Sequence, residues 1–370
     1  MPEKIQAPKG LEGVIVTRTS VSKIDGERGK LLYRGYDVEE LSRKLTFEQV
    51  VYLLWFGTIP SSDELREFDK DLFSKRDLMP DTLDFISRAP HAANPLVLLR
   101  SVTSLTGMHF DADKQLTLDA AKSLTPKFPT VLAYFDRIRN DRWLSRPSGE
   151  LSTAENFLYM LSGQKPPKEH ADALNSYLVL LADHGLNAST FSAIVTASTL
   201  TDYYSAIEAA IGTLKGPLHG GAPSQVWEML KEIGDEKNAK GWLERRIESG
   251  GRIMGFGHRV YRTEDPRSKV LKGIAKKVAR PQIFELAQRV EETVRELLRE
   301  KHPERTLETN VEFYSSLVLD AVGIPVDMFT STFACSRLVG WTAHILEQLA
   351  DNRLFRPESQ YIGPEGLLLP

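Results

Sequence analysis

The stretch GFGHRVYRTEDPR, residues 255–267, places one histidine directly after two glycines and adds Arg259, Arg262 and Arg267 behind it. Glycine destabilises a helix interior by about 1 kcal/mol relative to alanine, so the two glycines disfavour a helix here. The apolar Phe256 and Tyr261 argue against a freely solvated loop. The segment therefore predicts backbone that approaches a ligand closely, with an imidazole and guanidinium groups directed at the same place. An anion with a polar, reactive carbon centre fits that combination.

The composition of the whole chain narrows the class of protein. Its 370 residues carry 47 basic and 50 acidic side chains, a net charge of −3. This balance argues against a protein that binds nucleic acids or membrane surfaces. The single cysteine, Cys335, excludes an intramolecular disulfide framework and fits a reducing cytosol. No signal peptide is visible in residues 1–20, and no apolar run is long enough for a membrane span. We expect a cytoplasmic protein, either of about two domains or with one large helical body and an insertion.

The patterning predicts a mainly α fold that begins with a β-hairpin. Short alternating runs around Val14 and Val16, and around Leu31 and Tyr33, predict strands joined by a turn at Asp25-Gly26. Helices are then predicted to begin after Asp37, at Thr46 and at Pro281, and to run from Phe329 to Leu349. Charged, glycine-bearing linkers are predicted at 233–241 and 249–257. No internal repeat is found, nor the strand–helix alternation that builds a parallel sheet.

Residues that could bind a ligand or transfer a proton lie among apolar or glycine-rich neighbours in four segments. They are His184 in LADHGLNAST, His219 in KGPLHGGAPSQVWE, His258 in the first stretch, and Glu312 in TNVEFYSS. Taken alone, His184 could be a helix C-cap and Glu312 an exposed acid on a half-buried helix. Arg337 is a further anomaly, because a permanent cation in an apolar helix needs a buried anion, either a structural acid or a substrate carboxylate.

Other kinds of site fit the sequence less well. The three histidines lie 35 and 39 residues apart, without HExxH or a second histidine one helical turn away, which argues against a metal site but leaves distant ligands possible. The segment GGRIMGFG has neither the P-loop lysine nor the GxGxxG order, and a GxSxG nucleophile motif is absent.

The motifs together closely resemble the citrate synthase family. GPLHGGA, GFGHRVYRTEDPR, NVEFYSS, SRLVGWTAHILEQ and RPESQYIGP carry the resemblance, and IDGERGKLLYRGYDVEEL resembles the N-terminal hairpin of that family. The resemblance implies a two-domain helical fold, with a large domain formed by 1–216 and 322–370 and a small domain at 217–321. It also implies a homodimer in which Arg356 crosses to the partner's site.

The family chemistry then implies a role for each matching residue. Glu312 would remove a proton from the methyl group of acetyl-CoA while His219 donates to the thioester carbonyl. His258 would act on the ketone oxygen of oxaloacetate, and His184, Arg267, Arg337 and Arg356 would hold that substrate. Coenzyme A contacts are expected from residues of the glycine-bearing segment and two arginines: Ile253, Met254, Gly255, Phe256, Gly257, Arg262 and Arg305. Neither a metal nor a cofactor is implied.

One residue departs from the pattern of the family. Glu312 stands where members usually carry aspartate, so its carboxylate reaches one methylene farther, and an error of about 1 Å can lower a rate about 100-fold. Citrate synthase is the main hypothesis, and 2-methylcitrate synthase is the closest alternative, because one methylene in a pocket is worth only about 1–3 kcal/mol. A metal-dependent hydrolase and a non-catalytic acyl-CoA-binding protein are the rivals from other classes.

Overall fold

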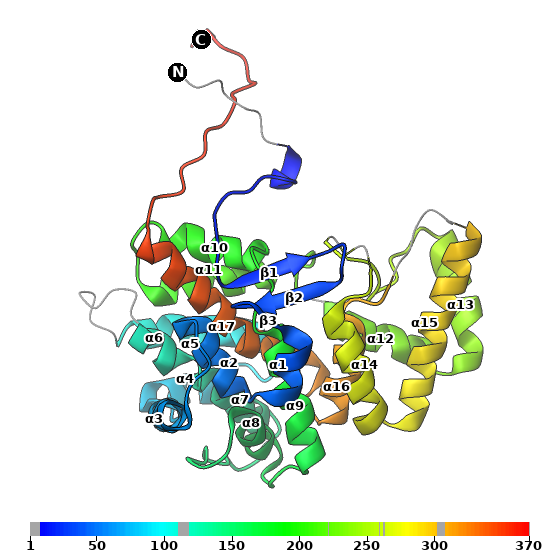
Figure 1. The fold of residues 1–370 in the computed structure, drawn as a ribbon, viewed down its shortest axis with the longest axis horizontal. Coiled ribbons are helices and arrows are strands. Elements are labelled where there is room, and N and C mark those ends of the chain that lie inside the picture. The colour runs from blue at the N-terminus through cyan, green and yellow to red at the C-terminus, as the bar shows by residue number, and fades with distance from the viewer. Residues whose placement is uncertain are drawn as a thin grey trace.

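The computed structural model describes residues 8–109, 118–220, 222–258, 260–261, 263–301 and 308–369. Most of the chain is helical, with one small sheet near the N-terminus, as the sequence predicts (Figure 1). The elements in chain order are η1 Lys9–Leu11, β1 Ser22–Asp25, β2 Lys30–Tyr33, β3 Tyr36–Asp37, α1 Val38–Lys44, α2 Phe47–Phe56, α3 Ser62–Phe73, α4 Pro80–Arg88, α5 Pro95–Gly107, α6 Leu118–Leu124, α7 Lys127–Arg139, α8 Thr153–Ser162, α9 Lys168–Leu181, α10 Ala188–Ala197, α11 Tyr203–Leu214, α12 Ala222–Ile233, α13 Glu236–Glu248, α14 Pro266–Val278, α15 Pro281–Lys301, α16 Val311–Ala321, η2 Val326–Met328 and α17 Phe329–Ala350.

The N-terminal sheet contains the predicted hairpin and a third short strand. β1 and β2 pair antiparallel from Ser22 opposite Tyr33 to Asp25 opposite Lys30, and β3 pairs with the end of β2. The strand predicted at Val14 and Val16 is wrong, because β2 pairs with Ser22–Asp25 instead and leaves the earlier residues without a partner strand.

Capping residues set the predicted helix starts. The Asp37 carboxylate accepts the backbone N–H of Glu39 at the start of α1, and Thr46 forms a capping box with Gln49 at the start of α2. Gly57 ends α2 with a φ of 85°, a left-handed conformation that favours glycine. The starts of α1 and α2 confirm the predictions made from Asp37 and Thr46.

One predicted linker is helical. Residues 236–241 belong to α13, which Asp235 caps by accepting the N–H of Lys237. The penalty of about 1 kcal/mol for Gly241 is outweighed by this cap and by the good helix formers around it.

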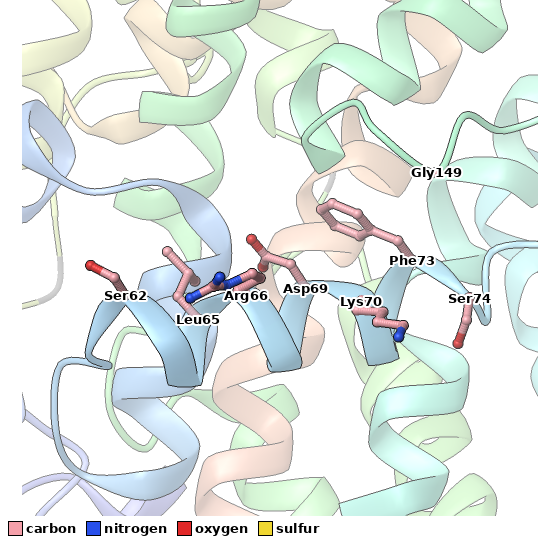
Figure 2. A pocket seen from close by; sticks show the side chains of 8 residues that line it. All are labelled: Ser62, Leu65, Arg66, Asp69, Lys70, Phe73, Ser74 and Gly149. Carbon is pink, nitrogen blue, oxygen red and sulfur yellow. The ribbon is translucent and has the colours of Figure 1, made fainter.

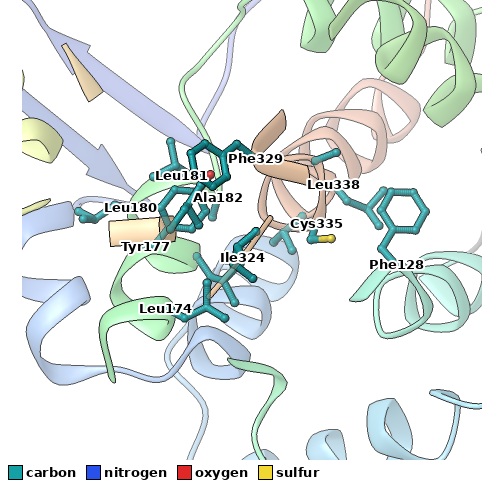
Figure 3. Packing of buried hydrophobic residues seen from close by; sticks show 14 of the residues in the cluster. Phe128, Leu174, Tyr177, Leu180, Leu181, Ala182, Ile324, Phe329, Cys335 and Leu338 are labelled. Atoms are coloured by element: carbon teal, nitrogen blue, oxygen red, sulfur yellow. The ribbon is translucent and has the colours of Figure 1, made fainter. Parts of the chain in front are cut away.

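Buried side chains of α9 and α17, among them Tyr177, Leu181 and Leu338, belong to one hydrophobic cluster, part of which Figure 3 shows from close by. The backbones of the two helices meet directly, because the N–H of Gly340 donates to the carbonyl of Ala182 at 3.1 Å. A Cβ on Gly340 would lie 2.4 Å from that oxygen, so only glycine allows this contact. The contact fixes the end of α9 immediately before His184.

Helices α12 to α16 pack mainly on one another and lie to one side of the molecule (Figure 1). From this group α14 and α16, the helices that carry Arg267 and Glu312, also contact α9. The predicted small domain, 217–321, covers these helices, and its boundaries stay a prediction.

Candidate active site

The turn after α9 presents His184 and is held from two sides. The buried Asp183 carboxylate accepts bonds from the hydroxyl of Ser22 and from the N–H of Gly185, and it pairs with His344 of α17 at 3.2 Å. The hydroxyl of Tyr33 donates to the carbonyl oxygen of Asp183 at 2.8 Å. The sheet and α17 therefore fix the backbone on which His184 stands.

His258 lies across from His184, with ring centroids 5.3 Å apart. Its Nδ1 accepts two backbone N–H groups, from Val260 at 2.9 Å and from Tyr261 at 3.0 Å. Because Nδ1 accepts, the proton of the neutral ring is on Nε2, which is then a hydrogen-bond donor. Burial and the charge of Arg267 lower the pKa of His258 to about 4, so the ring is neutral at physiological pH.

Glu312 is the second residue of α16, on a backbone bound to the loop of His258. Gly257 N–H donates to the carbonyl of Glu308 at 2.9 Å, Asn310 N–H donates to the carbonyl of Gly255 at 2.9 Å, and Phe256 bridges Thr309. This backbone ladder places the segment of His258 beside the start of α16, so both residues belong to one unit.

The Glu312 carboxylate is the basic group of this unit. Among the described side chains none makes a hydrogen bond or ion pair with it. Burial raises the pKa of Glu312, more than the nearby charge of Arg267 lowers it. A desolvated carboxylate whose pKa is raised is a stronger base than one in water.

Arg267, in the first turn of α14, is almost fully buried beside Asp265. Its Nε donates to Asp265 Oδ1 at 3.0 Å and its Nη2 to Oδ2 at 2.8 Å. Asp265 also caps α14 through the backbone N–H of Arg267. The pair uses one edge of the guanidinium, and the end formed by Nη1 and Nη2 is left for another carboxylate.

Arg337, on α17, is a buried cation without a carboxylate in contact in the described parts of the chain. Only 2% of its surface is exposed, its Nε donates to the carbonyl of Leu181, and its guanidinium lies 4.5 Å from the ring centre of Phe333. Burial lowers the pKa of Arg337 to about 10, against the attraction of Asp183. A charge buried in this way needs an anion.

His219 lies in the turn between α11 and α12, where its Nε2 is 2.8 Å from the hydroxyl of Ser189. Trp341 donates to the same hydroxyl at 3.0 Å, and this hydroxyl donates to Asn187 Oδ1 at 2.7 Å. Burial, followed by the charge of Arg337, lowers the pKa of His219 to about 4, so this imidazole is neutral too.

The electrostatic couplings join these residues into one site. The charges of Arg267 and Arg337 both act to lower the pKa of His184 and of Glu312, and the charge of Arg337 also acts to lower the pKa of His219. The site therefore has two buried guanidinium groups, neutral imidazoles and one basic carboxylate. This combination can bind a small dicarboxylate and remove a proton from a second molecule beside it.

Comparisons with known proteins place the chain in a family. A family model described as "Citrate synthase, C-terminal domain" matches residues 10–358. The chain belongs to the citrate synthase family. Citrate synthase of Haloferax volcanii is 42% identical, covering 97% of this chain and 96% of that protein, and 2-methylcitrate synthase 1 of Corynebacterium glutamicum is 38% identical, covering 97% and 96%. Members are transferases that act on acyl groups.

A solved structure of the family gives the same fold. The ternary complex of citrate synthase from Thermoplasma acidophilum with carboxymethyl coenzyme A and oxaloacetate has a TM-score of 0.90, 33% identity and 98% coverage of both chains. The prediction of a two-domain helical citrate synthase fold is confirmed.

Some residues predicted from the family resemblance do not join the cluster. Arg356 is exposed after α17 and makes no hydrogen bond or ion pair with a described residue of its own chain. Arg262 and Arg305 lie outside the described residues. Gly255 has a φ of 81°, and a Cβ there would lie 2.7 Å from the ring of Phe313. Backbone conformation and packing therefore already require this glycine, without a ligand.

The family resemblance did not single out the residues that orient the predicted ones. Asp265, Ser189 and Tyr261 each contact a predicted residue directly. Asp265 had a local signal, because an aspartate before proline is typical of a helix start with proline in its first turn. The other two contacts join residues far apart in the sequence and carry no local signal.

A groove of about 610 Å³ runs along α3, and none of the candidate residues lines it (Figure 2). The part of the chain that the structure describes contains no group of three His, Cys, Asp or Glu side chains placed to hold a metal ion. None of its helices has the length and apolar content of a membrane span.

Proposed function

We propose that the protein is a citrate synthase that condenses acetyl-CoA with oxaloacetate and hydrolyses the resulting citryl-CoA to citrate and CoA. The observation that carries the proposal is the buried Arg337, which has no carboxylate in contact among the described residues and lies in electrostatic reach of Arg267 and Glu312. Oxaloacetate supplies the two carboxylates that such a pair of arginines needs.

The first step is proton removal from the methyl group of acetyl-CoA. Glu312 takes the proton, and His219 stabilises the enolate oxygen that forms. The Ser189 hydroxyl donates to Asn187 Oδ1, which also accepts the backbone N–H groups of Ser189 and Thr190. We propose that this hydroxyl turns to donate to His219 Nε2, 2.8 Å away, when acetyl-CoA binds. The proton of the neutral ring is then on Nδ1, from which it can be donated to the thioester oxygen.

Carbon–carbon bond formation follows at the ketone of oxaloacetate. The Nε2–H of His258 is directed by two backbone donors on Nδ1 and donates to the ketone oxygen as it becomes an alkoxide. Water then cleaves the thioester of citryl-CoA, releasing CoA as the thiol. Each charge that develops has a protein donor, so we propose that neither a metal nor a cofactor takes part.

The remaining parts of the proposal concern assembly and coenzyme A. We propose a cytoplasmic homodimer in which the exposed Arg356 completes the oxaloacetate site of the partner subunit. Residues 253–257, with Arg262 and Arg305, are proposed to contact coenzyme A.

The direct test measures thiol release from acetyl-CoA and from propionyl-CoA, each with oxaloacetate. We expect kcat/KM to be higher for acetyl-CoA. A preference for propionyl-CoA would make the enzyme a 2-methylcitrate synthase, and CoA binding without thiol release from either substrate would make it an acyl-CoA-binding protein. Exhaustive dialysis against a chelator should leave activity unchanged, whereas a loss that zinc or manganese restores would favour a metal-dependent enzyme.

A further inference from the structure

Tyr261 contacts both histidines of the proposed oxaloacetate site. Its ring centroid lies 4.6 Å from that of His258 and 5.6 Å from that of His184, and only 4% of its surface is exposed. Its backbone N–H donates to His258 Nδ1, and its hydroxyl lies 3.2 Å from His184 Nε2. One residue therefore orients two rings that come from distant parts of the chain.

The donor in the Tyr261–His184 hydrogen bond follows from the protonation states of the two groups. Burial is the largest cause that lowers the pKa of His184 and the largest that raises the pKa of Tyr261, so both groups are neutral. Among the described residues the phenol has no other hydrogen-bond partner. A buried hydroxyl that only accepted would leave its proton unpaired, so the phenol donates to Nε2. The proton of His184 is then on Nδ1, which has no partner in the described part of the chain.

The loop of Tyr261 is also supported from behind by the N-terminal hairpin. A Cβ on Gly26 would lie 2.3 Å from the carbonyl oxygen of Val260, and one on Gly29 would lie 2.7 Å from the hydroxyl of Thr263. The turn between β1 and β2 therefore packs backbone to backbone on this loop. The loop is fixed between the hairpin and the end of α9, where His184 stands.

We propose that Tyr261 is a positioning residue for oxaloacetate. Its hydroxyl holds His184 as the Nδ1–H tautomer, so that Nδ1 is a donor for the substrate, and it joins the turn after α9 to the loop of His258. This inference rests on the proposed function. It predicts an effect on oxaloacetate binding rather than on proton removal, because the contacts of Tyr261 in the described structure are with His184 and His258 and not with Glu312 or His219.

Tyr261→Phe keeps the ring and removes only the hydroxyl. We expect the KM for oxaloacetate and its calorimetric Kd to rise about 3- to 10-fold, which corresponds to the loss of one hydrogen bond. The kcat and the KM for acetyl-CoA should change less than about twofold, because no hydrogen bond that serves proton removal is lost. Tyr203→Phe is the matched control, since it removes a buried hydroxyl that bonds Thr342 outside the site. It should leave the oxaloacetate KM unchanged.

Two further measurements separate positioning from general stability and from the proposed function. In ¹⁵N NMR of the ligand-free protein, His184 should be the Nδ1–H tautomer, and Tyr261→Phe should shift it toward Nε2–H. In a His184→Ala background, Tyr261→Phe should have no further effect on oxaloacetate affinity. Additive effects, an unchanged tautomer or a loss confined to kcat would overturn the inference. Failure of the wild-type protein to bind oxaloacetate would instead refute the proposed function. The NMR result would still show whether the hydroxyl of Tyr261 sets the tautomer of His184.

Discussion

Asp265 binds Arg267 along one edge of the guanidinium, through Nε at 3.0 Å and Nη2 at 2.8 Å. The carboxylate therefore determines which end of Arg267 faces a ligand. It also places a negative charge near Glu312, where it contributes to the raised pKa of that carboxyl group. The orientation of one proposed binding residue and the basicity of the proposed base thus depend on the same side chain.

Asp265→Asn should change both properties. Asparagine can still cap α14, but its NH2 group is a donor and cannot accept the N–H of Arg267 that one aspartate oxygen accepts. Arg267 is then held less firmly, so the oxaloacetate KM should rise. Loss of the negative charge, together with the greater influence of Arg267, stabilises the ionised form of Glu312 and lowers its pKa. Because the base acts when ionised, the acidic limb of the kcat profile should move to lower pH. A limb that stays in place or moves to higher pH would contradict this coupling.

Arg337→Met should separate ligand affinity from stability. We expect oxaloacetate binding to weaken at least about 10-fold, because a charged hydrogen bond is lost. The free energy of unfolding without ligand should stay equal or rise, since relief of an uncompensated buried charge outweighs the bond to Leu181. Calorimetric titration and thermal unfolding measure the two effects. A variant that is markedly less stable without ligand would indicate that Arg337 has a structural counter-ion.

Glu312→Gln should remove the base and preserve its shape. We expect kcat to fall at least about 100- to 10,000-fold with oxaloacetate affinity nearly unchanged. Glu312→Asp tests the reach of the carboxylate. It should also be slower if the backbone is adjusted to the longer side chain. An aspartate variant as fast as the parent would mean that either length serves, and a glutamine variant that keeps most of its kcat would exclude Glu312 as the base.

Arg356 should act on the partner's site. Mixing inactive Arg356→Ala chains with inactive Glu312→Ala chains gives heterodimers with one intact site and one doubly defective site. Random exchange should restore about a quarter of the wild-type activity, because half of the dimers are mixed and each has one working site. No recovery in heterodimers confirmed by mass spectrometry would mean that Arg356 does not complete the partner's site.

His219 and His258, whose pKa values are both lowered to about 4, should make stability depend on pH. The unfolded chain takes up protons on these rings below pH ~6.5, whereas in the folded chain His219 and His258 have pKa values of about 4. Their contribution is thus complete above pH ~6.5 and is lost as the pH falls toward 4. His258→Gln should flatten the decline of the unfolding free energy between pH 7 and 5, while the exposed His91→Gln should not.

Much of the fold and of the candidate site could be predicted from short patterns. Asp37 and Thr46 act on their own helices, so their caps are readable locally, and the histidine and arginine motifs are long enough to match a family. The partnership of Ser189 with His219 could not be predicted, because it depends on how α10 packs beside the turn before α12. The helix through Gly241 could not be predicted from that residue, because the helical penalty of one glycine is small beside the cap and the helix formers of the rest of α13.

The backbone ladder between residues 255–257 and 308–310 has a mechanical consequence. It joins the proposed base and the proposed ketone donor through main-chain hydrogen bonds, so the start of α16 and the segment of His258 form one unit. A shift of α16 would carry His258 with it and keep the spacing between the two groups. The alignment of proton removal with alkoxide protonation is therefore set inside this unit and does not depend on the distant segments that contribute Arg337 and His219.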